Sequence, residues 1–191
     1  MNIFSIALTL FLLMDSIGNI PLYLSLLKNL DGKRQRFVIL RELFIALIVI
    51  IIFMFLGDWL MDFLQIDEGT IQIAGGIILF LICLKMIFPS KDDPKEKNPK
   101  GEEPLVVPLA VPFIAGPAVL AAVIIFSRQH ISHWIMMGAI IIAWVASLII
   151  LLASSYLHNL LGWRGLTAIE RLMGLILILI AVQMFMNGIR A

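Results

Sequence analysis

Six stretches of this sequence are long and apolar enough to cross a lipid bilayer as helices. They lie at about residues 4–27, 37–57, 70–88, 105–127, 134–156 and 172–189. A hydrocarbon core of about 30 Å needs roughly 20 apolar residues of α-helix. Lipid offers no hydrogen-bond partners to exposed backbone, so helices are the natural way to satisfy it. The sequence therefore predicts an all-α membrane protein with six transmembrane helices.

The composition excludes an ordinary soluble domain. The chain is 61% hydrophobic and 14% charged, whereas soluble domains are roughly 45–50% apolar and about 25% charged. No H-E-x-x-H, P-loop or G-x-S-x-G motif is present, so we expect neither an enzyme nor an ATP-driven pump. The single Cys83 forms no internal disulfide and no metal site by itself. We expect no resident cofactor or metal and no nucleic-acid partner.

The basic residues predict the orientation of the chain. The three loops expected on one side carry ten of them: Lys28, Lys33, Arg34, Arg36, Lys91, Lys95, Lys97, Lys100, Arg164 and Arg171. The other side carries only Arg128 and Arg190, and its loop at 58–69 holds four acidic residues. Cytoplasmic loops collect Lys and Arg. Both termini are therefore expected in the periplasm.

The two halves of the chain resemble each other at a shift of 98 residues. That shift places Gly76 on Gly174, and "DSIGNIP" (15–21) over "FIAGPAV" (113–119). Three spans are an odd number, so the second half would enter the membrane upside down. Paired interrupted spans in such an inverted repeat mark transporter binding sites. We expect a first repeat at 1–90, a charged cytoplasmic linker at 91–104 and a second, inverted repeat at 105–191.

Spans one and four are predicted to be broken near the bilayer centre. Proline removes a backbone donor and crowds the preceding turn, and glycine relaxes the backbone. Broken helix ends offer N–H groups to a carboxylate and C=O groups to a cation. The candidate substrate-binding residues are Asp15, Ser16, Gly18, Asn19, Pro21, Pro112, Ala115, Gly116 and Pro117.

Asp15 is also the candidate for coupling to a cation. Its carboxyl group could bind a substrate ammonium, a sodium ion or a proton. A structural role, in which it caps the broken helix or pairs with Arg41, stays open. A charge at this depth costs about 2.5–3.5 kcal/mol or more, which favours a function for it.

A further set of residues is expected to form gates or to pack helices. Charged pairs stand near the cytoplasmic ends of two spans, and glycines allow helices to approach closely. The set comprises Arg41, Glu42, Gly75, Gly76, Glu170, Arg171 and Gly174. For the charged members, simple snorkelling to the membrane surface stays an alternative.

Four segments together resemble the MarC family of bacterial inner-membrane proteins. They are "MDSIGNIP" (14–21), "IAGGIILFLICLKMIFPS" (73–90), "VPLAVPFIAGP" (107–117) and "ERLMGLILILIAVQMF" (170–185). The resemblance covers essentially the whole chain and is closest to the YhgN-like branch. It implies a six-span protein of the inner membrane, classed with transporters of small neutral amino acids such as glycine or alanine. The family pattern usually reads D-P-x-G-N-x-P, so Ser16 stands where a proline is usual.

Three functions remain open at this point. The first is a secondary transporter of small neutral amino acids, with the lipid bilayer and a small substrate as its partners. The second is a channel or an exporter for another small solute. The third is a membrane scaffold that transports nothing. The sequence does not indicate an oligomeric state.

Overall fold

The computed structural model describes residues 2–27, 30–88, 114–129 and 131–191, and the described part is helical without a strand. The helices are α1 (Ile3–Met14), α2 (Ile20–Leu27), α3 (Gly32–Leu64), α4 (Glu68–Ile87), α6 (Pro117–Arg128), α7 (His133–Leu152) and α8 (Ser154–Arg190). Within these residues α3, α4, α7 and α8 are long and apolar enough to span a membrane, and α1 and α6 are shorter apolar helices. The predicted linker at 91–104 and the first part of the fourth predicted span lie outside the described residues.

Two helices are longer than the sequence predicts. Helix α3 begins at Gly32 and ends at Leu64, where Gln65 adopts a left-handed conformation with φ 54°. The predicted span, 37–57, follows the apolar residues alone. Lys, Arg and Gln are good helix formers, so the helix continues through the polar residues 33–36.

The loop expected between the fifth and sixth spans is mostly helix. Only Ala153 separates α7 from α8, and α8 continues through residues 157–171, interrupted at Gly162 (φ 65°, ψ 175°). That conformation favours glycine, which has no Cβ. The prediction of a long loop is wrong here, because hydropathy reports where lipid ends and not where a helix ends.

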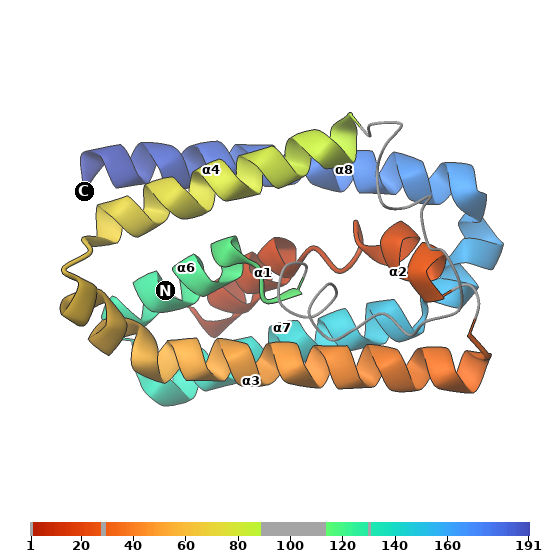
Figure 1. Ribbon diagram of the computed structural model, residues 1–191, viewed down its shortest axis with the longest axis horizontal. Coiled ribbons are helices and arrows are strands. Elements are labelled where there is room, and N and C mark those ends of the chain that lie inside the picture. Colours follow the sequence, from red (N-terminus) through yellow and green to blue (C-terminus); the bar gives the residue numbers. More distant parts are fainter. Residues whose placement is uncertain (1, 28–29, 89–113, 130) are drawn as a thin grey trace.

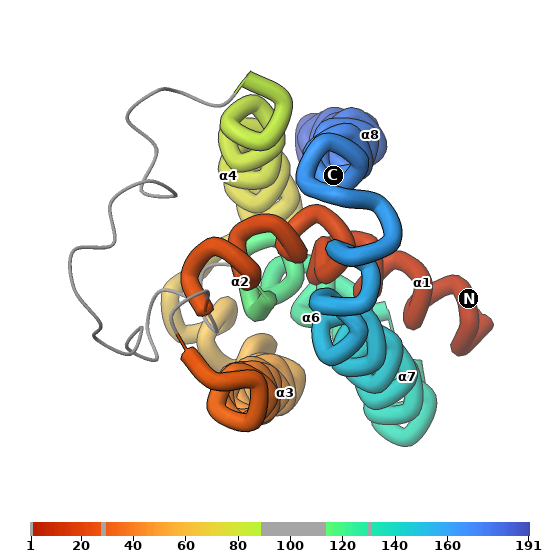
Figure 2. The backbone as a smooth tube through the Cα atoms, turned by 90° about the vertical axis from the view of Figure 1, so that its right-hand side faces the viewer, coloured from red at the N-terminus to blue at the C-terminus, as the bar shows by residue number. Residues whose placement is uncertain are grey.

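The short helices lie between two groups of long ones. Helices α4 and α8 lie side by side along one face of the bundle (Figure 1). Figure 2 shows α1, α2 and α6 between this pair and the helices α3 and α7. Helix α1 packs on α7 and on α6, α2 packs on α8, and α6 packs on both α3 and α4. The end of α1 and the start of α2 are therefore buried among the other helices, whereas Phe4 and Leu8 of α1 are exposed.

The chain direction alternates through the bundle. In Figure 1 it runs from left to right through α1, α4 and α7, and from right to left through α3, α6 and α8. Helices α1, α3 and α4 thus run opposite to α6, α7 and α8, respectively.

Glycines bring α4 and α8 into close contact. A Cβ built on Gly76 would lie 2.8 Å from the carbonyl oxygen of Ala181. A Cβ built on Gly174 would lie 3.6 Å from the carbonyl oxygen of Cys83 and 3.4 Å from the Cβ of Met86. Both glycines are buried. The helix pair therefore packs backbone against backbone at these two positions.

We predict that Gly76→Ala destabilises the protein by about 1–3 kcal/mol, because the added methyl group meets a backbone oxygen that cannot rotate away. The measurement is thermal unfolding of the purified protein in detergent. Gly32→Ala is the matched control, since nothing lies within 4 Å of a Cβ at Gly32. Equal stability of the two variants would contradict the close contact.

Candidate functional site

The first predicted span is two helices separated by a short unwound segment. Helix α1 ends at Met14 because Asp15 adopts a left-handed conformation (φ 43°, ψ 44°), and α2 begins at Ile20. Asp is among the few residues with a side chain that visit this region readily. Pro21 is the second residue of α2, where a missing N–H costs little because the first turn has no intrahelical acceptor. The break predicted in this span is present, and Asp15, not Pro21, ends the helix.

The unwound segment is held by its own polar groups. The backbone N–H of Gly18 donates to Oδ1 of Asp15 at 3.2 Å, and Nδ2 of Asn19 donates to the carbonyl oxygen of Met14 at 3.4 Å. The N–H of Asn19 donates to the carbonyl oxygen of Asp15 at 3.0 Å. These bonds satisfy backbone groups that α1 and α2 leave without helical partners.

Gly18 leaves room for the ends of two side chains. A Cβ at this position would lie 2.5 Å from Oδ2 of Asp15 and 2.6 Å from Cε of Met86 on α4. The absence of a side chain lets the Asp15 carboxyl group fold back over the break and lets α4 approach it. The sequence analysis expected this glycine to relax the backbone, whereas the contacts show that it leaves room for neighbouring side chains.

The polar side chains of the break are buried. The exposed fractions of Asp15, Ser16 and Asn19 are 6%, 1% and 8%. The Ser16 hydroxyl has no hydrogen-bond partner within the described part of the chain. A buried polar atom without a partner costs about 1–3 kcal/mol. This hydroxyl is therefore suited to bind a ligand or a water molecule.

Helices α4 and α8 supply the remaining neighbours of Asp15. The carboxyl group of Glu170 on α8 is 6% exposed and interacts electrostatically with Asp15. Cys83 of α4 also lies within electrostatic range of Asp15. The sequence interpretation assigned Glu170 to a gate or to helix packing, and the structure adds that its charge acts on Asp15. Arg171, its neighbour in sequence, is exposed.

The second predicted break is described in part. Ile114, Ala115 and Gly116 are buried, and Gly116 is the N-cap of α6 with Pro117 at its first position. Pro117 itself is exposed, and Pro112 lies outside the described residues. Helix α6 begins beside α1 (Figure 1), so the start of α6 and the break after α1 belong to one region of the bundle.

The other predicted residues pack helices or pair with one another. Nε and Nη2 of Arg41 donate to Oε1 of Glu42 at 3.1 and 2.8 Å, and Glu42 is fully buried. A Cβ built on Gly75 would lie 3.0 Å from the Cβ of Ala121, so this glycine lets α4 approach α6. Among the predicted residues, Asp15, Ser16, Asn19 and Glu170 come together, and Arg41 and Glu42 form a pair on α3.

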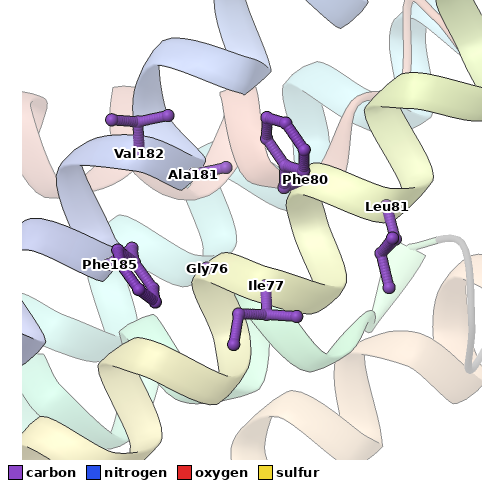
Figure 3. Close-up of a pocket in the computed structure, with 7 residues that line it drawn as sticks. All are labelled: Gly76, Ile77, Phe80, Leu81, Ala181, Val182 and Phe185. Carbon is purple, nitrogen blue, oxygen red and sulfur yellow. The ribbon is translucent and has the colours of Figure 1, made fainter.

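An apolar groove of about 260 Å³ lies between α4 and α8 and is distinct from the break. Its lining residues are Gly76, Ile77, Phe80, Leu81, Ala181, Val182 and Phe185 (Figure 3). Lining of this kind offers neither charge nor hydrogen bond to a polar solute. Several of these side chains are exposed, as expected for a surface that faces lipid.

Long apolar helices around a buried, unwound polar segment define a multi-pass integral membrane protein. The model of the family described as "MarC family integral membrane protein" matches residues 1–191, and the chain belongs to this family.

Three curated relatives illustrate the similarity. The chain is 47% identical over 191 residues to the UPF0056 membrane protein BU449 of Buchnera aphidicola, which covers 100% of this chain and 97% of the relative. It is 47% identical over 192 residues to the UPF0056 inner membrane protein YhgN of Escherichia coli K12, and the aligned region spans 99% of this chain and 96% of the relative. A UPF0056 membrane protein of Chlamydia pneumoniae is 40% identical over 186 residues, covering 97% and 92%. No solved structure matches the chain.

The break allows a comparison of two neighbouring variants. We predict that Gly18→Ala lowers stability by about 0.5–1.5 kcal/mol, because its methyl group would displace the Asp15 carboxyl group from its hydrogen bond with the Gly18 N–H. Ser16→Ala is expected to keep or raise stability, because the hydroxyl that it removes has no partner. Thermal unfolding in detergent measures both. A loss for Ser16→Ala as large as for Gly18→Ala would contradict the described geometry.

Proposed function

We propose that the protein is a secondary transporter of small neutral amino acids, with glycine or alanine as the substrate class. The observation that carries the proposal is the buried break at Asp15–Asn19, where polar side chains and helix ends meet inside an apolar bundle. Irregular backbone at membrane depth is tolerated where it is buried in protein or lines a wet cavity. A binding site would account for a polar, non-helical segment at this depth.

Two features support an inverted repeat with six spans. The corresponding elements of the two halves run in opposite directions (Figure 1). The contacts also correspond: Gly76 meets Ala181 and Met184, and Gly174 meets Cys83 and Met86, pairs related by the same shift of 98 residues. In this arrangement α1 and α2 form one broken span, and α6 is the second half of another.

The contacts between spans follow the same exchange. The first span packs on the fifth through α1 and α7, and the fourth packs on the second through α6 and α3. The first packs on the sixth through α2 and α8, and the fourth packs on the third through α6 and α4. Exchanging the halves turns the contact of α2 with α8 into the contact of α6 with α4, as expected for repeat-related halves. The contacts of α1 with α7 and of α6 with α3 correspond only span by span.

The chemistry of the region suits a zwitterion. Asp15 and Glu170 place two carboxyl groups where a substrate ammonium or a coupling cation would bind. The N–H groups of Ala118 and Val119 lie in the first turn of α6 and lack intrahelical acceptors by geometry; a helix N-terminus attracts a carboxylate. The Ser16 hydroxyl and the Asn19 amide can bond either end of the substrate.

Two buried carboxyl groups in electrostatic contact also suit coupling to a cation. A cation bound near Asp15 would offset the cost of a carboxylate buried in the bundle. We propose Asp15 as the coupling residue, with Glu170 as its partner. Arg41 and Glu42 would act at a gate.

We infer the membrane from the name of a relative and the orientation of the chain from its basic residues. The name of the Escherichia coli relative places that protein in the inner membrane, and we propose the same membrane here. The basic residues near the start of α3 and in the first half of α8 would face the cytoplasm. The start of α1 and the end of α8 would then face the periplasm.

Transport by purified protein in liposomes tests the proposal. We predict that the wild-type protein exchanges radiolabelled glycine or alanine, and that Asp15→Asn lowers the exchange rate at least tenfold, because the variant cannot carry the charge that the cation neutralises. Asp31→Asn is the matched control, since Asp31 is an exposed residue before α3 and should leave the rate unchanged.

Three results would contradict the proposal. One is wild-type protein that exchanges neither amino acid under a sodium or a proton gradient. Another is exchange that Asp15→Asn and Asp31→Asn affect equally. A flux that does not saturate with substrate and survives Asp15→Asn would favour a channel instead.

A further inference from the structure

A cavity of about 610 Å³ lies where α2, the start of α3 and the first part of α8 meet. Binding pockets for small molecules have typical volumes of about 300–1,000 Å³, so this cavity holds a small solute together with water. Its described lining is mixed, with polar groups from Ser25, Gln35, His158 and Asn159 beside Leu24 and Trp163. The other groove, between α4 and α8, has an apolar lining.

The cavity is close to the break along the chain. Ser25 lies five residues after Ile20, the first residue of α2, which corresponds to roughly 7.5 Å along a helix. Helix α2 packs on α8, and α8 also carries Glu170 beside Asp15. The same two helices therefore border the cavity and the candidate site.

The walls of the cavity are held in place by local contacts. Nε2 of Gln35 donates to the carbonyl oxygens of Leu27 and Leu30, both at 2.9 Å, which ties the start of α3 to the end of α2. The rings of His158 and Trp163 meet edge to face with their centroids 6.3 Å apart. The cavity is thus a formed feature with bonded walls.

At the opposite end of the bundle, partly exposed ion pairs join two helices. The Arg128 guanidinium pairs with Asp62 and, at 3.5 Å, with Asp58, joining the end of α6 to the last turns of α3. The Ser127 hydroxyl adds a bond of 3.4 Å to the carbonyl oxygen of Met54. The two ends of the bundle therefore differ: a polar cavity at the basic end, and ion pairs between helices at the acidic end.

We infer that the cavity at α2, α3 and α8 is the inner vestibule through which a small zwitterionic solute reaches the break, and that Arg128 with Asp58 and Asp62 forms the outer gate. The structure is then the inward-open state of the carrier. This inference rests on the proposed function. It adds Ser25, His158 and Asn159 as residues of the pathway, none of which the sequence interpretation selected.

Site-directed cysteine labelling in oriented membrane vesicles tests the vestibule. Ser25→Cys and Asn159→Cys place thiols on the α2 and α8 walls. We expect a charged, membrane-impermeant thiol reagent added on the cytoplasmic side to modify both, to lower glycine or alanine exchange at least tenfold, and to react more slowly when the amino acid is present.

Two controls separate the vestibule from general exposure. Asp31→Cys places a thiol on the same end of the protein outside the cavity, so labelling should leave exchange unchanged. The wild-type protein carries only Cys83, which is fully buried, and should not react. Labelling of Ser25→Cys and Asn159→Cys that leaves exchange intact, as for Asp31→Cys, would overturn the vestibule and spare the proposed function. Wild-type protein without exchange would overturn both.

The outer gate has its own readout. Arg128→Gln removes both ion pairs and is expected to increase the outward-open population, so that Asn159→Cys reacts at least threefold more slowly from the cytoplasmic side. Lys33→Gln, which changes an exposed cation near the cavity, controls for the loss of a charge. If Asn159→Cys reacts at the same rate with Arg128 present and with Arg128→Gln, the assignment of the gate is overturned.

Discussion

Backbone hydrogen bonding inside an apolar bundle is the constraint on which the rest of this structure depends. Each unsatisfied N–H or C=O group in lipid costs several kcal/mol. Helix α1 ends before Asp15, so the backbone groups that follow need other hydrogen-bond partners. The break persists because Asp15 and Asn19 bond the neighbouring backbone and because long helices exclude lipid from it. The polar groups that stabilise the break are also the ones proposed to bind a solute.

Close helix packing makes that enclosure possible. Gly75 lets α4 approach α6, and Gly76 and Gly174 bring α4 and α8 into backbone contact. Gly18 admits the Asp15 carboxyl group and Met86 in the same way. A larger residue at Gly75 would separate α4 from α6, and larger residues at Gly76 or Gly174 would separate α4 from α8. The glycines therefore connect the packing of the bundle to the burial of the site.

The sequence predicts the helical membrane class and the first break, because apolar length and the cluster Asp15, Ser16, Gly18 and Asn19 are local signals. Helix ends are less predictable: α3 and α8 continue through polar residues that suit a helix as well as a loop. The electrostatic interaction of Glu170 with Asp15 gave no local signal, because it comes from packing across 155 positions of the chain. The cavity beside Ser25 and Asn159 gave no local signal, since its polar residues are common at helix ends.

Hydrogen exchange at the break tests the central claim most directly. If residues 15–20 bind the substrate through their polar groups, alanine added to the purified protein should slow deuterium uptake by the amides of this segment, including Gly18 and Asn19. The last turns of α3, which pair with Arg128 at the other end of the bundle, should show little change. Unchanged uptake at 15–20 in a folded protein that exchanges alanine in liposomes would contradict a binding site at the break.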